Sequence, residues 1–260
     1  RTGGRNNYGR ISVRHHGENA RIATLLTESY GRHAGLVRGS GTGQGRAMGG
    51  ALQPGQMVRA TWRARLSEHL GNWQFEGVSH PAALILDDPA RLAALSAACA
   101  LIDAALPERE PHPNLFNATK VLFAHLPELP EPESWGALYV RWEAGLLSEM
   151  GYGLDLEACA ATGATTDLTH VSPRTGRAVS AQAAEPYIDR LLTLPSFLVP
   201  GRGRKANDAM AEVQAGLALT GHFLENRLFA QLHAPVPAAR TRLLELIRRT
   251  VTTSGVESGP

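Results

Sequence analysis

The spacing of apolar residues changes near residue 80, and this change limits the folds that the chain can adopt. Before it, short stretches alternate apolar and polar residues, and glycine and proline separate them. The clearest stretch spans 57–66, where Val58, Ala60, Trp62, Ala64 and Leu66 alternate with Arg59, Thr61, Arg63 and Arg65. A period of two is typical of a strand with one face in a core. Similar stretches at 9–14, 21–27, 33–38 and 73–75 predict a small closed β-barrel.

After residue 80 the apolar residues recur every three or four positions, which predicts helices. The expected helices cover 91–106, 116–126, 135–150, 186–194, 206–232 and 238–249. Asp88 and Pro89 are a typical start for the first helix, and Pro107 ends it. The polar interval 159–184 is expected to be a loop excursion. The sequence therefore predicts an α+β chain, with a barrel domain over 1–79 and an all-α helical domain over 80–260.

The two predicted domains carry opposite charge. Residues 1–79 hold eleven arginines, no lysine and four glutamates, a balance of +7. Residues 80–260 hold fifteen basic and twenty acidic residues, a balance of −5. A basic first domain indicates a polyanionic partner. The alternative is drift in an arginine-rich genome, since 24 of the 26 basic residues are arginine.

The polar face of the 57–66 strand is the best candidate for contact with that partner. Arg59, Arg63 and Arg65 occupy alternate positions of one face, and such positions repeat every ~6.6 Å along a strand. DNA carries a phosphate every ~3.4 Å along each strand, so the row can span several phosphates. Arg10 and Arg14 can add a second row from a neighbouring strand. The alternative is an ordinary solvated face. Trp62 lies on the core face, which favours packing over base stacking.

No pattern in the sequence indicates catalysis, a metal or a cofactor. The glycine-rich segment 39–50 lacks the Gly-Lys-Ser/Thr of a phosphate-binding loop, although Arg46 within it can touch a nucleic acid. The histidines lack partners at metal-ligand spacing. Cys99 and Cys159 are too few for a disulfide framework, which favours a reducing cytoplasm. The sequence shows no apolar run of the ~20 residues that span a membrane, and we expect a cytoplasmic, nucleoid-associated protein.

Several segments together resemble a known family. They are Gly9–Arg14, His16–Glu18, Leu25–Thr27, Gly31–Arg32, Gly35–Gly39 and Gln53–Gly55, then Glu143–Leu147, Gly151–Leu154, Leu156–Cys159, Val171–Val179 and Leu217–Thr220. In order and spacing they resemble the RecO family of bacterial DNA repair proteins, in the branch found in alphaproteobacteria. The likeness covers nearly the whole chain from about residue 9.

The resemblance implies an N-terminal OB-fold, a helical second domain and no enzymatic turnover. It implies binding of single- and double-stranded DNA, annealing of complementary strands, and help in loading RecA. The implied partners are RecR and single-stranded-DNA-binding protein, whose acidic tail can meet the basic cluster 202–205. The residues expected to contact DNA are Arg10, Arg14, Arg32, Arg38, Arg46, Arg59, Arg63 and Arg65.

The chain departs from the family at a metal site. Many relatives carry two C-x-x-C pairs in the second domain, where this chain has Cys159, Thr162, Ser180 and Ala183. One thiolate cannot hold a structural zinc ion, so no metal is expected, and other contacts must hold the region.

Two other functions stay open at this point. The basic face can bind a protein or an RNA in an adaptor without DNA activity. Less favoured is a hydrolase that acts on nucleic acid through an unrecognised site.

Overall fold

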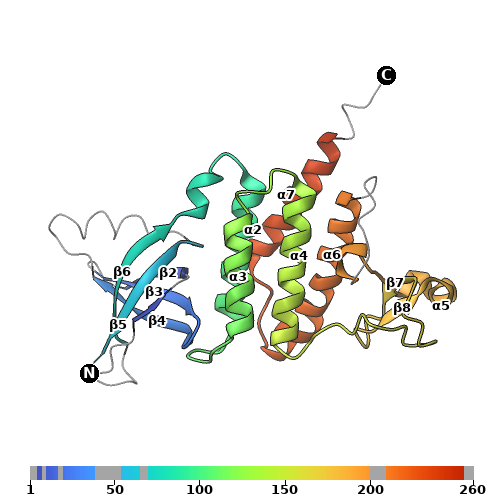
Figure 1. Cartoon of the computed structure of the whole chain (residues 1–260), viewed down its shortest axis with the longest axis horizontal. Helices are drawn as coiled ribbons and strands as arrows, with labels where there is room; N and C mark the ends of the chain where they lie inside the picture. The colour runs from blue at the N-terminus through green and yellow to red at the C-terminus, as the bar shows by residue number, and fades with distance from the viewer. Residues whose placement is uncertain are drawn as a thin grey trace. The chain divides into compact units, whose positions relative to one another are not determined.

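The computed structural model describes residues 5–7, 10–16, 20–38, 54–64, 70–199 and 209–254 (Figure 1). It divides into two compact units, 1–128 with 237–243, and 129–236 with 244–260. The first unit contains β1 (Arg5–Asn7), β2 (Arg10–His16), β3 (Ala20–Thr27), β4 (Gly31–Arg38), β5 (Met57–Arg63), β6 (Asn72–Ser79), the short 3-10 helix η1 (Pro81–Leu84), α2 (Pro89–Ala105) and α3 (Pro113–His125). The second contains α4 (Pro132–Glu149), β7 (Leu168–Val171), β8 (Ala178–Ser180), α5 (Ala181–Ala184), η2 (Glu185–Arg190), β9 (Leu192–Thr193), η3 (Ser196–Leu198), α6 (Ala209–Phe223) and the π-helical η5 (Leu224–Phe229). Helix α7 (Ala238–Ser254) has residues in both units.

The first six strands form one sheet with the connectivity of an OB-fold. Their order is β1-β5-β6-β4-β3-β2. All neighbours are antiparallel except β4 and β6, which pair in parallel at Leu36 and Asn72. Strands β1 and β2 lie at opposite edges of the sheet, yet Asn7 and Arg10 are three positions apart in the chain. Three residues span at most about 11 Å, so the sheet must curl until its edges approach. The predicted closed barrel is confirmed.

The barrel core comes from the inward positions of β3, β4, β5 and β6. It contains Ala23, Leu25, Val37, Val58, Ala60 and Trp73, with Trp62 packed against it. Two glycines allow the indoles to pack. A Cβ at Gly35 would lie 2.6 Å from Trp73, and a Cβ at Gly71 would lie 2.4 Å from Trp62. Each indole therefore rests directly on glycine backbone.

Helix α2 begins and ends where the sequence predicts. The Asp88 side chain accepts the Arg91 backbone N–H at 3.0 Å, Pro89 starts the first turn, and Leu106 ends the helix before Pro107. Nine of its apolar residues are buried. Leu95 packs against the turn at Gly55, where φ is +77° and a Cβ would lie 2.5 Å from the leucine side chain. The helix is thus anchored to the loop that enters β5.

Helices α4 and α6 form the centre of the second unit, side by side in Figure 1. Glycines bring them together, since a Cβ at Gly136 would lie 2.7 Å from Val213. Glu143 is fully buried and accepts a hydrogen bond from the Thr220 hydroxyl across this contact. These two residues belong to the segments 143–147 and 217–220 that carry part of the family resemblance, and the hydrogen bond gives both a structural role.

Two expectations for the second unit are wrong. Residues 186–194 do not form one helix: 185–190 make a 3-10 turn, and Leu192–Thr193 add strand β9 to β7. Leu192, which the prediction placed in a helix, pairs with Val171 of β7 instead. The interval 159–184 also contains β7, β8 and α5 within its loops. The division of the chain into domains at residue 80 stays a prediction.

Within the described ranges, no helix combines the length and the apolar character needed to cross a bilayer.

Candidate nucleic-acid interface

Strand β5 presents two arginines on the outer face of the barrel. Arg59 and Arg63 are exposed, whereas Val58 and Ala60 are buried. The alternation predicted from the sequence is confirmed here, and Arg65 lies outside the described residues. Two exposed guanidinium groups on one face of one strand can each approach a phosphate of the same nucleic-acid backbone.

The strands on either side of β5 set the charge around this row. On β1, Arg5 pairs with Thr61, which adds a basic residue beside the row. On β6, Glu76 stands opposite Arg59, while Asn72 stands opposite Arg63. Residues directly opposite in an antiparallel pair share a face. The register therefore places an acidic residue opposite Arg59 and a neutral residue opposite Arg63.

The other predicted row, on β2, is interrupted. Arg14 pairs with Ile22 of β3, and Ala20 of the same strand pairs with Arg38 of β4. A bulge between Arg10 and Ser12 shifts the register, so that Arg10 stands opposite the core residue Leu25. A bulge breaks the alternation that assigned Arg10 and Arg14 to one face. The partners of Arg14 and Arg38 on β3, Ile22 and Ala20, are two positions apart, so the register places both arginines on the same face of the sheet.

Arg32 is engaged within the first unit. Its Nε donates to the Leu106 carbonyl at 2.8 Å, and its Nη1 lies 3.3 Å from the Asp103 carboxylate. Its charge is thus partnered at the end of α2, away from the β5 row. Arg46 lies outside the described residues.

An aromatic cluster joins three strands of the barrel, β4, β5 and β6. The His33 ring lies 4.6 Å from Trp62 and 5.3 Å from Trp73, measured between ring centroids. Burial, together with the nearby Arg109 charge, lowers the pKa of His33 to about 4. The Arg109 guanidinium lies over Trp62, 5.5 Å from the ring centroid. Sequence reasoning missed Arg109, because no pattern in the loop between α2 and α3 marks it.

The region around Cys159, where the family resemblance implies zinc cysteines, is held by hydrogen bonds. The buried Cys159 sulfur accepts the Ser180 backbone N–H at 3.2 Å, and Cys159 N–H donates to the Ala164 carbonyl at 2.7 Å. Burial raises the pKa of Cys159, but hydrogen bonds with Ser180 and Thr162 outweigh it and lower the pKa to about 6. Over the described part of the chain, no group of three or more His, Cys, Asp or Glu side chains can hold a metal ion. The four positions do not suit zinc.

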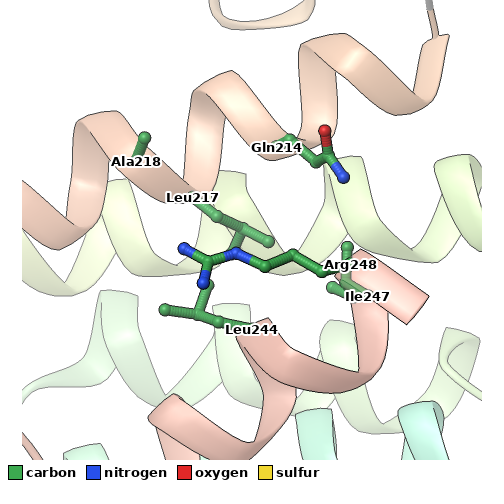
Figure 2. A pocket seen from close by; sticks show the side chains of 6 residues that line it. All are labelled: Gln214, Leu217, Ala218, Leu244, Ile247 and Arg248. Atoms are coloured by element: carbon green, nitrogen blue, oxygen red, sulfur yellow. The ribbon is translucent and has the colours of Figure 1, made fainter. Parts of the chain in front are cut away.

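A groove of about 180 Å³ lies between α6 and α7 in the second unit. Figure 2 shows Arg248 extended across it, with Leu217, Leu244 and Ile247 around it and Gln214 at its edge. Most of the lining is apolar and only one residue is basic. The groove suits an apolar contact better than a polyanion.

Comparisons with known proteins agree with the described fold. The family descriptions "Recombination protein O N terminal" and "Recombination protein O C terminal" match residues 10–79 and 86–235. A DNA repair protein RecO of Rhodospirillum centenum is 58% identical over 252 residues, which cover 96% of each chain. The RecO of Phenylobacterium zucineum is 51% identical over 236 residues, covering 90% of this chain and 93% of the relative. That of Caulobacter vibrioides is 48% identical over 235 residues, with the same coverage.

Proposed function

Because the chain belongs to the RecO family of DNA repair and recombination proteins, we propose that it binds single- and double-stranded DNA through the outer face of its barrel and anneals complementary strands. The observation that carries the proposal is the exposure of Arg59 and Arg63, four positions apart on one face of β5. Neutralising phosphates with arginine releases condensed counterions, which supplies affinity for any sequence. Arg14 and Arg38 extend the contact if the nucleic acid continues across β2 and β4.

Annealing follows from the same chemistry. Two complementary strands repel each other through their phosphates, and a basic surface that binds both lowers this repulsion. Contacts to the backbone leave base edges available for pairing. The protein then needs no chemical step, no metal and no nucleotide, and we propose that it is not an enzyme.

We further propose that the protein assists RecA loading together with RecR, on DNA coated with single-stranded-DNA-binding protein. These partners follow from family membership. The basic cluster 202–205, proposed to meet the acidic tail of the latter protein, lies outside the described residues.

The test uses the full chain with fluorescently labelled complementary strands, without added metal or nucleotide. We expect faster annealing than in buffer alone, and strands of unchanged length on a denaturing gel. Shortened strands would replace the proposal with a nucleic-acid hydrolase. Neither annealing nor DNA binding would favour an adaptor for protein or RNA.

A further inference from the structure

The segment that follows α2 holds one arginine in an unusual backbone conformation. Arg109 has a φ of +62°, in the left-handed region that residues with a Cβ avoid. Its backbone N–H donates to the Arg32 carbonyl at 2.7 Å, which ties the segment to β4. Its side chain is exposed, and the guanidinium carbon lies 5.5 Å from the Trp62 ring centroid. Backbone and indole together fix where this cation sits.

The indole behind Arg109 has little freedom to move. His33 packs against Trp62 at 4.6 Å, and Gly71 backbone lies against the indole so closely that a Cβ there would be 2.4 Å away. His33 is uncharged at neutral pH, because its pKa is lowered to about 4. Tyr30 is 49% exposed, and the centroid of its ring lies 6.5 Å from that of His33. The cation therefore rests on a rigid aromatic base, with another aromatic side chain near it.

The charges around Arg109 decide which part of a nucleic acid suits it. Glu108 and Glu110 are its neighbours in the chain, both exposed, and Glu108 also accepts the Ala34 backbone N–H at 3.4 Å. Two carboxylates disfavour a phosphate at this point, since like charges repel. A nucleobase carries no charge, and its π-face stacks well on a planar guanidinium group. Phosphates are better placed at Arg63, which follows Trp62 in β5 but lies on the opposite, outer face of the strand.

We propose that the Arg109 guanidinium, supported by Trp62, is a stacking site for one unpaired nucleobase of single-stranded DNA. This proposal rests on the proposed function, and it adds a site specific for single strands to the backbone contacts. Bases inside a duplex are already stacked on both faces, so a duplex cannot use this site.

The test compares Arg109→Lys with Arg141→Lys in the full chain. Lysine keeps the charge at either position but has no planar group for stacking. Arg141 is a matched control, because its guanidinium lies 5.4 Å from the Phe197 ring centroid in the second unit. Affinities are measured for a thymidine oligomer, for an abasic oligomer of equal length, and for a duplex. The midpoint of thermal unfolding of each variant serves as the folding control.

We expect Arg109→Lys to bind the thymidine oligomer about fivefold more weakly, at the lower end of the effect of losing one base stack. Its affinity for the abasic strand and the duplex should stay at the wild-type value, and Arg141→Lys should match wild type on all three. Equal weakening on the abasic strand would show a phosphate contact and overturn the proposal. Unchanged binding of the thymidine oligomer would also overturn it.

Failure of the proposed function has a different signature. A wild-type protein that binds none of the three nucleic acids refutes DNA binding altogether, and the stacking site with it. If wild type binds the abasic strand and the duplex, DNA binding stands whatever Arg109→Lys does.

Discussion

The sharpest prediction concerns the two exposed arginines of β5. Replacing Arg59 and Arg63 together by alanine removes two cations from the outer face and leaves the buried residues Val58 and Ala60 untouched. If both guanidinium groups contact phosphates, the double variant releases fewer counterions on binding. Its affinity should therefore depend less steeply on salt than that of the wild type.

The magnitude follows from the number of contacts. Each phosphate contact contributes about 0.7 to the slope of log affinity against log salt for single strands, and about 0.9 for duplex DNA. Losing two contacts should flatten the slope by about 1.4 and about 1.8 respectively. The weakening should be similar for all sequences, because phosphate contacts do not read bases.

The two single variants should differ. Glu76 stands opposite Arg59, whereas the neutral Asn72 stands opposite Arg63. A carboxylate at the paired position competes with phosphate for the arginine, so Arg63→Ala should flatten the slope more than Arg59→Ala. Glu76→Gln should steepen the slope relative to wild type.

The assay is fluorescence anisotropy across a salt series, with circular dichroism as the folding control. The double variant Arg174→Ala and Arg190→Ala removes the same charge from exposed positions of the second unit. An equal change of slope in both double variants would reduce the effect to net charge. An unchanged slope in a folded Arg59 and Arg63 double variant would mean that DNA follows another surface.

Three further predictions concern stability and metal content. Gly71→Ala places a Cβ 2.4 Å from Trp62 and should lower the free energy of unfolding by about 1–3 kcal/mol. Gly145→Ala, in helix α4, adds a Cβ with no atom within 4 Å and should raise the free energy of unfolding by up to about 1 kcal/mol. Urea unfolding compares the two variants, and equal effects would contradict the packing argument. Because the pKa of His33 falls from the ordinary 6.5 to about 4 on folding, the unfolded chain takes up the proton first, so stability should be full above pH 6.5 and drop by at most about 3 kcal/mol as the pH falls to 4. His33→Phe should remove that part of the pH dependence, and an unchanged profile would refute it. Elemental analysis should find much less than one zinc ion per chain, and a chelator should leave the unfolding midpoint unchanged, because Cys159 is the one thiolate at the four positions.

The sequence was sufficient where structure depends on local periodicity. The alternation through β5 separates Arg59 and Arg63 from Val58 and Ala60, because side chains of a strand point alternately to its two faces. The alternation does not predict which residue of β6 lies opposite each arginine. That depends on the register between β5 and β6, and a bulge at the start of the pair, between Met57 and Val58, helps to set the register.

Long-range contacts account for the other differences. From the sequence, Arg32 looks like one more exposed basic residue of the first domain. Its partners Asp103 and Leu106 lie more than 70 positions away in the chain. Arg109 was missed for the same reason. The residue that gives it a role, Trp62, belongs to a strand of the barrel, and neither local sequence contains a signal for their contact.

The region around Cys159 is held together by backbone hydrogen bonds and strand pairing. A zinc knuckle uses the metal to fix two turns relative to each other. Here the Cys159 sulfur accepts the Ser180 N–H, the Ala160 N–H donates to Ala178 at 2.8 Å, and β7 pairs with both β8 and β9. Arg177 adds an ion pair with Asp155 at 3.1 Å, although both side chains are about half exposed and the pair contributes little by itself. The polar composition of 159–184 did not predict these strands. Backbone hydrogen bonds stabilise the region, and such bonds form with any side chain, so a hydrophobicity pattern does not reveal them. Strand pairing and the hydrogen bond to the Cys159 sulfur therefore hold together the region in which the family resemblance implies the zinc cysteines.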